Sequence, residues 1–331
     1  MNKRKRALYE HMWGSEAFDF PVEKTKYRGV RSNNSYTFTN ASAFSKDICR
    51  DRLVELFAIK RPDLFCEKFK ESCGGSGQEL KRIATLHSSS LCALLFFYNV
   101  SKENPYVMEI EGAKYTFTQS SFEYKNVVIE NRNPSNIDVV LLGTDKSRNA
   151  VVLFLESKFS EYYESGSKRL KVAAAYRDDL YGKEIYGEQV LAKLGLQATT
   201  GVGDSFLLQA QESCYLGGIK QMISHYIGIR KLFRNAPYRN NVVAKAIASG
   251  ARVLLGEILF TEKIGELPLS TGEPCLDSYK TIYRKLAQVL CGQLKKDGIS
   301  NFTVLGDVLS YSDLQDKIEP RIKRFYFELG K

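Results

Sequence analysis

The sequence has few of the residues that build several common functional sites. Its seven cysteines are scattered and include no C-x-x-C pair, which argues against a structural zinc site and against a disulfide framework. Only three histidines occur and no G-x-S-x-G elbow is present, so nothing indicates a serine hydrolase of that type. The glycine-rich stretch 74–77 is not followed by Gly-Lys-Ser/Thr, which excludes a Walker phosphate loop.

Long apolar runs are missing as well. No uninterrupted apolar segment approaches the roughly 20 residues that a membrane-spanning helix needs, and no apolar signal-peptide core follows Met1. Several cysteines lie in apolar helical contexts, which is typical of buried thiols in a reducing compartment. We therefore expect a cytoplasmic protein that does not contact a membrane.

Basic residues outnumber acidic ones, 48 to 38, which gives a formal charge of +10 and an isoelectric point near 9.1. Such an excess favours a polyanionic partner. One basic cluster, Lys168, Arg169 and Lys171, follows soon after an apolar strand, and we predict that it binds nucleic-acid phosphates. Many basic surfaces merely keep proteins soluble, so the charge alone leaves that alternative open.

Two apolar stretches, 134–142 and 151–159, are each typical of a β-strand, and the polar residues between them predict a turn. Folded as an antiparallel hairpin, they bring Asp138 to about the level of Leu155 and Glu156. Glu156 and Lys158 are two residues apart and project from one face of their strand. Two carboxylates and one ammonium therefore converge at one end of the hairpin. The alternative is an exposed, solvated charge pair of little energetic value.

A hard divalent cation suits this cluster. Mg²⁺ takes oxygen ligands, commonly one or two carboxylates together with water and substrate phosphate. We expect Asp138 and Glu156 to bind Mg²⁺ or Mn²⁺, with the Ser157 carbonyl as a further oxygen ligand. Lys158 would orient or deprotonate the attacking water and stabilise charge on the phosphate.

These residues, in this order on a hairpin, resemble the PD-(D/E)xK nuclease superfamily, in which an Asp opens one strand and Glu-x-Lys closes the next. Glu156-Ser157-Lys158 matches fully, whereas Pro134 and Asp138 are not adjacent, so the first half of the motif is loose. The resemblance implies an additional acidic metal ligand on a helix before the sheet, and Glu79 fits that role by its order in the chain. A first-turn acid favoured by the helix dipole is the alternative for Glu79.

The segment 214–228 predicts an amphipathic helix that resembles the Q-x-x-x-Y helix of RecB-like members of that superfamily. Gln221 matches, but His225 stands four residues later and Tyr226 follows it, so the match is partial. Lys220, Gln221 and His225 lie close together on the helix because residues three and four apart are neighbours. We expect Gln221 in the active site and Lys220 and His225 at the nucleic acid; a surface Gln and a capped His are the alternative.

The resemblance implies an α/β fold with a restriction-endonuclease-like αβββαβ core, a central mixed sheet flanked by helices. We expect an N-terminal helical extension over 1–73, the core over 74–265 with an insertion near 162–210, and a C-terminal helical extension over 266–331. Strands are expected near 106–118 and 121–130, in the hairpin and at 252–260. Helices are expected near 45–59, 61–72, 77–98, 211–233, 241–249, 277–295 and 312–329.

The functional expectation is a Mg²⁺-dependent nuclease that hydrolyses DNA phosphodiester bonds, similar to bacterial restriction-endonuclease-like proteins. A homodimer would supply the two sites that cutting both strands requires. Three alternatives stay open: an RNA-directed nuclease, a nucleic-acid-binding protein of the same fold that no longer cleaves, and an interaction protein whose charged hairpin is only surface.

Overall fold

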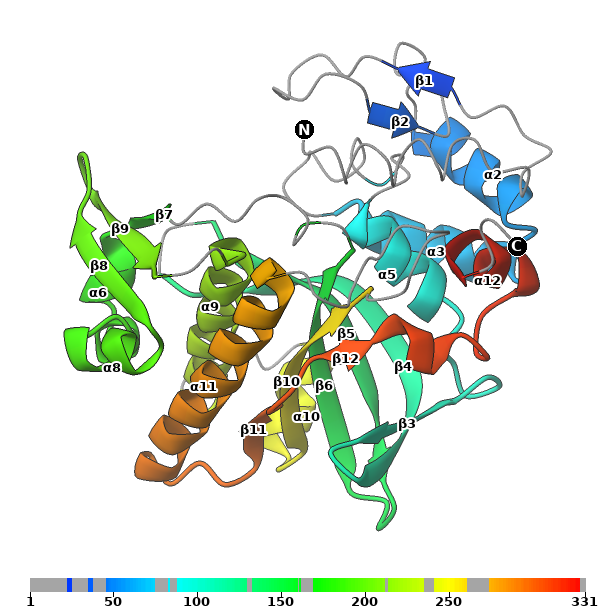
Figure 1. Ribbon diagram of the computed structural model, residues 1–331. Helices are drawn as coiled ribbons and strands as arrows, with labels where there is room; N and C mark the ends of the chain where they lie inside the picture. The colour runs from blue at the N-terminus through cyan, green and yellow to red at the C-terminus, as the bar shows by residue number, and fades with distance from the viewer. Residues whose placement is uncertain are drawn as a thin grey trace.

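A large mixed sheet forms the centre of the computed structural model (Figure 1). The residues described are 23–25, 35–37, 46–74, 83, 88–129, 133–159, 161, 169–211, 214–234, 241–260 and 274–327. The strand order is β11-β10-β6-β5-β4-β3, and the short β12 also pairs with β10. The strands are β3 (Tyr106–Ile110), β4 (Ala113–Asn126), β5 (Ser135–Asp145), β6 (Ala150–Lys158), β10 (Arg252–Leu259), β11 (Phe302–Val304) and β12 (Leu309–Ser310).

The sheet combines an antiparallel meander with parallel strands. Strands β3 to β6 pair antiparallel in chain order, whereas β10 runs parallel to β6, and β11 and β12 run parallel to β10. Strands β6 and β10 are buried along almost their whole length, as near-continuous apolar runs covered on both faces must be. The structure therefore confirms an α/β fold with a central mixed sheet flanked by helices; the specific restriction-endonuclease core stays a prediction.

Helices cover this sheet on both sides (Figure 1). Helix α5 contacts β5 and β6, α10 contacts β6, and α9 contacts β4, β5 and β10, while α11 packs on α9 and β11. The helices of the body are α2 (Lys46–Leu56), α3 (Pro62–Ser72), α5 (Ser89–Phe97), α9 (Leu216–Leu232), α10 (Val242–Ala248), α11 (Pro274–Lys296) and α12 (Pro320–Phe327).

Two predicted boundaries differ from the structure. The strands expected at 106–118 and 121–130 form a hairpin that turns at Glu111 and Gly112, both of which have positive φ, as two-residue hairpin turns require. Strand β4 then continues through 119–120, with only a register shift between Phe117 and Gln119. The C-terminal part is also more than a helical extension, since β11 and β12 join the central sheet. Strands of two or three residues carry too little pattern to be predicted.

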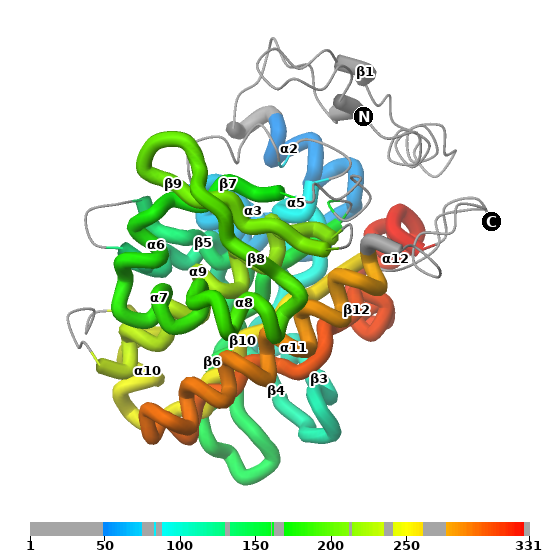
Figure 2. Tube along the Cα trace, turned by 60° about the vertical axis from the view of Figure 1, so that its left-hand side comes forward, coloured from blue at the N-terminus to red at the C-terminus, as the bar shows by residue number. Residues whose placement is uncertain are grey.

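The described residues of the segment 162–210, which is predicted to be an insertion, include a second, smaller sheet with its own short helices. Strands β7 (Arg169–Ala173), β9 (Ser205–Ala210) and β8 (Leu196–Thr200) pair antiparallel in that order. Helices α6 (Ala175–Asp178), α7 (Gly182–Ile185) and α8 (Glu188–Lys193) lie between β7 and β8 in the chain. In Figure 2 this sheet lies at the front, over helix α9. A further two-stranded pair, β1 (Glu23–Thr25) and β2 (Ser35–Thr37), precedes α2.

Candidate active site

The β5–β6 hairpin has the register that the sequence predicts. Val139 pairs with Leu155, which leaves Asp138 and Glu156 as the next residues at that end. At the end of the hairpin away from its turn, Asp138 joins the two strands, because its Oδ2 accepts a 2.7 Å hydrogen bond from the Ser157 backbone N–H. Asp138 precedes the buried apolar run of β5 and Glu156 follows that of β6, and the hairpin itself brings the two acids together.

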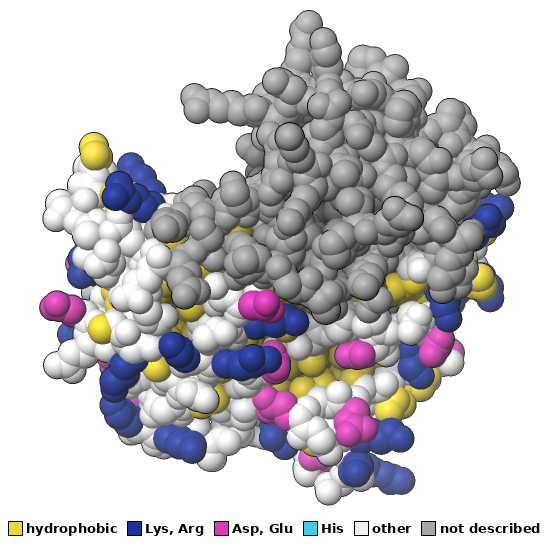
Figure 3. Space-filling model, viewed as in Figure 1, with side chains coloured by type: hydrophobic (Ala, Val, Ile, Leu, Met, Phe, Trp, Pro, Cys, Tyr) yellow, Lys and Arg dark blue, Asp and Glu magenta, His cyan; other side chains and the backbone are white. Residues whose placement is uncertain are grey.

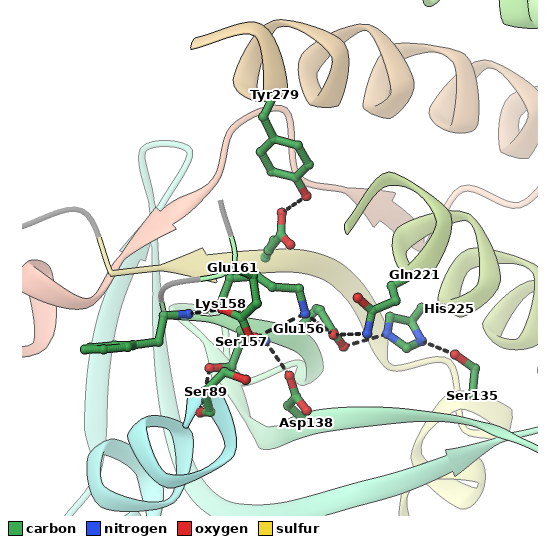
Figure 4. A network of polar contacts seen from close by, with 12 residues as sticks. Ser89, Ser135, Asp138, Glu156, Ser157, Lys158, Glu161, Gln221, His225 and Tyr279 are labelled. Carbon is green, nitrogen blue, oxygen red and sulfur yellow. Dashed lines mark hydrogen bonds and ion pairs between the residues drawn. The ribbon is translucent and has the colours of Figure 1, made fainter. Parts of the chain in front are cut away.

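Three donors hold the Glu156 carboxylate (Figure 4). Its Oε1 accepts from the Lys158 ammonium and, at 2.6 Å, from the Gln221 side-chain amide. Its Oε2 lies 2.7 Å from His225 Nε2. The Glu156 side chain is only 1% exposed, so these bonds replace water as its solvation. Asp138, Glu156, Lys158, Gln221 and His225 thus form one cluster.

The partners of Glu156 outweigh the cost of burying its charge. Burial by itself raises the pKa of this carboxyl, but Lys158 and His225 lower it, and the net pKa is about 2. Glu156 is therefore ionised at neutral pH. An ionised buried carboxylate with charge-assisted hydrogen bonds is fixed in position and orientation.

Asp138 behaves in the opposite way. Burial and the nearby negative charge of Glu156 raise the pKa of Asp138 well above its usual range, although Lys158 partly opposes this. Two carboxylates that share one partly dry site repel each other when both are charged. A divalent cation between them would relieve that repulsion, so this donor set fits Mg²⁺ or Mn²⁺.

The Lys158 side chain is 5% exposed. Burial lowers the pKa of its ammonium, but Glu156, Tyr215 and Asp138 together raise that pKa well above its usual range. Lys158 Nζ also donates to the Ser157 carbonyl oxygen at 3.2 Å. The side chain is thus a fixed cation beside both carboxylates.

Ser157 anchors the end of the hairpin from the other side. Its hydroxyl donates to the Ser89 carbonyl at the start of α5, at 3.0 Å, and lies 2.7 Å from the Tyr311 hydroxyl. The Ser157 side chain is fully buried. Contacts from α5 and from the C-terminal segment therefore fix the strand end on which the acids lie.

Helix α9 brings Gln221 and His225 against Glu156 from the opposite side. His225 Nδ1 lies 3.1 Å from the Ser135 hydroxyl, and the His225 backbone carbonyl accepts from the Asn126 amide at 3.0 Å. Gly228, on the same helix, permits this approach, because a Cβ there would collide with the Asn126 side chain. His225 is predicted to contact nucleic acid, yet its ring is completely buried behind Glu156, where it positions that carboxylate.

Glu257 is a buried acid beside the site that the sequence did not single out. It lies on β10 in register with Glu156 on β6 and is completely buried. Its Oε2 accepts from the Tyr279 hydroxyl of α11, while its Oε1 has no hydrogen-bond partner among the described residues. Burial, only partly opposed by Lys158 and Tyr279, raises its pKa to about 8. The sequence signal that could have identified Glu257 is an acidic residue inside the apolar strand predicted at 252–260.

The other predicted residues lie elsewhere or outside the described residues. Glu79 and Lys168 are not among them. Arg169 and Lys171 are exposed on β7 in the smaller sheet, and Lys220 lies half-buried, with its Nζ 5.1 Å from the centre of the Tyr176 ring. Among the described residues, no group of three or more His, Cys, Asp or Glu side chains could hold a metal ion. Asp138 and Glu156 alone are therefore the acidic side chains of the described site that are proposed as metal ligands.

The family of restriction endonucleases associating with ARP has a model that matches residues 53–244. The chain belongs to this family. The match runs from α2 to the start of α10 and includes Asp138, Glu156, Lys158 and Gln221, whereas Glu257 lies beyond it. It confirms the predicted restriction-endonuclease-like family, and membership of the PD-(D/E)xK superfamily stays a prediction. No curated protein and no solved structure matches the chain significantly.

Within the described part of the chain, no helix is both long enough and apolar enough to cross a bilayer.

Proposed function

We propose that this protein is a metal-dependent nuclease that hydrolyses DNA phosphodiester bonds. One observation carries the proposal: an ionised Glu156 and the Lys158 ammonium are fixed beside Asp138 at the end of an apolar hairpin. The family's description as a restriction endonuclease supports the same activity. The proposal of a restriction or defence function in the cell rests on that description alone.

Asp138 and Glu156 would hold Mg²⁺ or Mn²⁺, with the Ser157 carbonyl as a further oxygen ligand and Glu79 as a third acidic candidate. When bound, such an ion activates water and stabilises negative charge on a phosphate. Asp138 is the carboxylate better placed to gain a ligand, because among the described residues it has one hydrogen-bond donor, the Ser157 N–H, whereas Glu156 has three partners. Glu156 Oε2, which has His225 as its partner, can accept one further bond.

Lys158 supplies the positive charge of the chemistry. As an ammonium it has three donors, and two of them reach Glu156 and the Ser157 carbonyl. The third can orient the attacking water or donate to a phosphate oxygen, where a preorganised donor stabilises the charge that develops in the transition state. Gln221 and His225 act through Glu156, whose orientation they fix.

A second candidate function is nucleic-acid binding without cleavage. One observation favours it: Lys158, Gln221 and His225 already occupy the Glu156 carboxylate, and the side chains of Glu156 and Lys158 are 1% and 5% exposed. A site closed in this way would have to open for a metal ion and a phosphate. An RNA-directed nuclease is tested in the same experiment.

The test uses purified protein with supercoiled plasmid, a single-stranded DNA oligonucleotide and an RNA of the same sequence, each with Mg²⁺, Mn²⁺ or EDTA. The proposal expects metal-dependent cleavage of DNA that is lost in Asp138→Ala and in Lys158→Ala. Circular dichroism and thermal melting show whether each variant is folded. Cleavage that survives both substitutions would place the chemistry elsewhere, and salt-dependent binding without cleavage would favour the second candidate.

A further inference from the structure

The smaller sheet presents two very different faces. Alternate residues of a strand point to opposite sides, and the inner side carries Val172, Phe206 and Leu208, all buried. Phe206 packs edge-on against Tyr186, which follows α7, with ring centres 5.2 Å apart. Helix α9 contacts both β7 and β9. The sheet is therefore anchored on the helix that carries Gln221.

The outer face is polar and basic. Arg169, Gln209 and Gln197 form one row across the three strands, and Lys171, Leu207 and Thr199 form the next row. Arg169, Lys171 and Gln197 are exposed. The three strands contain two cations and no Asp or Glu, so their own side chains carry a net positive charge. This is the charge pattern of a surface that meets phosphates.

The two glutamines in the first row are already aligned. Gln197 Nε2 donates to Gln209 Oε1 at 3.0 Å. This bond leaves the Gln209 amide hydrogens as donors and the Gln197 carbonyl oxygen as an acceptor in the same row. Adenine presents the complementary pair, N7 as acceptor and the N6 amino group as donor, in the major groove.

The turn between β8 and β9 presents an apolar residue to solvent. Val202 is 85% exposed and lies between Gly201 and Gly203. Gly203 has a φ of +66°, and a Cβ on Gly201 would approach the Ser205 carbonyl oxygen to 2.6 Å. The Ser205 hydroxyl donates to the Val202 carbonyl at 2.7 Å. The turn is thus built around glycines that leave Val202 at its tip. Figure 3 shows basic side chains beside an apolar one where this turn projects.

We propose that the outer face of the β7–β9–β8 sheet is the surface that reads double-stranded DNA for this enzyme, a proposal that rests on the proposed nuclease function. The β8–β9 side of the three-stranded sheet faces into the major groove, Gln197 and Gln209 contact base edges, and Val202 meets the methyl group of a thymine. Arg169 and Lys171 on the edge strand β7 bind phosphates of one DNA strand.

The dimensions support B-form DNA as the partner. Neighbouring strands lie about 4.8 Å apart, so the three strands β7, β9 and β8 span about 10 Å between their outer axes, which is less than the roughly 12 Å width of the B-DNA major groove. The major groove of an RNA duplex is too deep and narrow for side chains to read. The surface therefore fits duplex DNA, and RNA of the same sequence is the comparison that can refute this choice.

The experiment measures binding separately from cleavage. Fluorescence anisotropy in EDTA measures the affinity of the full-length protein for a labelled DNA duplex with a randomised centre, at several salt concentrations. The variants are Arg169→Ala/Lys171→Ala and Gln197→Ala/Gln209→Ala. The matched control is Lys285→Ala/Lys296→Ala, which removes two exposed charges of α11. Because no metal is present, binding is observed whether or not the protein cleaves.

We expect the first variant to bind DNA more weakly and to reduce the slope of log K against log salt by about 2, because each phosphate contact adds about 0.9. The glutamine variant should keep the slope but lose base preference, seen by sequencing the bound fraction of the pool. Unchanged binding in both variants would overturn the proposed DNA-reading surface, even if the wild type cleaves DNA. Equal affinity for duplex RNA, or loss of binding in the control alone, would also overturn it.

Discussion

Glu156 and Glu257 are two buried glutamates that lie in register on neighbouring parallel strands, yet their charges differ. Both pKa values are raised by burial. Around Glu156, Lys158 and His225 reverse this and the pKa is about 2, whereas around Glu257 the more distant charge of Lys158 and the Tyr279 hydroxyl oppose burial only in part and the pKa is about 8. The comparison shows that partners, and not depth, decide which acid in this sheet is a carboxylate at neutral pH.

The largest expected effect comes from removing the charge that Lys158 neutralises. Glu156→Ala leaves a buried ammonium without its main counter-ion, so the free energy of unfolding should fall by about 3–5 kcal/mol. Urea denaturation measures this. The control is Lys146→Ala, an exposed position in the turn of the same hairpin, where the change should be within about 0.5 kcal/mol. Equal midpoints for the two variants would contradict the assignment of Glu156 as the paired charge.

The two glutamates should also differ in how stability depends on pH. Glu257 has a folded pKa above its ordinary value of 4.5, near 8, so it destabilises the folded state progressively as pH rises from 4.5 to 8. Against Glu257→Gln, the wild type should lose up to about 1.4 kcal/mol per pH unit in that window. Glu156, with its pKa lowered to about 2, instead contributes stability that is lost as pH falls from 4.5 toward 2.

Urea denaturation of the wild type and Glu257→Gln at a series of pH values checks this prediction. Curves that stay parallel from pH 4.5 to 8 would show that Glu257 is ionised in the folded state. The comparison between the two glutamates would then fail.

His225 tests whether positioning of Glu156 matters separately from its charge. His225→Ala removes the bond to Glu156 Oε2 and should cost about 1.5–3 kcal/mol of stability and about 10–100-fold in cleavage rate or metal affinity. Ser135→Ala, which removes only the partner of His225 Nδ1, should cost about 0.5–1.5 kcal/mol. A cleavage rate that is unchanged in His225→Ala would make the histidine purely structural. The rate is measured under single-turnover conditions over a range of Mg²⁺ concentrations.

The smallest effect is expected at Tyr279. Tyr279→Phe removes the hydroxyl that donates to Glu257 and should lower the free energy of unfolding by about 1 kcal/mol. Cleavage should be unaffected, because Tyr279 bonds to Glu257 and has no bond to Glu156. A large loss of cleavage in a folded Tyr279→Phe protein would instead join Glu257 to the catalytic cluster.

The sequence predicted the part of the site that local pattern encodes. Alternation and apolar runs place Asp138 opposite Glu156 and put Lys158 on the same face, and the hairpin has this register. Helical spacing placed Gln221 beside His225. The burial of His225 and its bond to Glu156 could not be predicted, because they depend on how closely α9 approaches β5, and no local signal gives that distance.

The rest of the fold depended on contacts far apart in the chain. Glu257 meets Glu156 only because β10 pairs parallel with β6, about a hundred residues earlier in the chain. The two short strands β11 and β12 have little pattern of their own and are strands because β10 offers them an edge. The expected helix at 312–329 is likewise divided into a 3-10 turn at Tyr311–Leu314 and α12, and Pro320, favoured at a helix start, marks that division.

The most direct test of the active site compares two lysines of one hairpin. The rate of plasmid cleavage in Mg²⁺ is measured for the wild type, for Lys158→Ala and for Lys146→Ala, after each variant is shown to be folded. The assignment predicts that Lys146→Ala cleaves at the wild-type rate and that Lys158→Ala has lost cleavage. Equal rates in the two variants would contradict the claim that the Asp138, Glu156 and Lys158 cluster performs the chemistry.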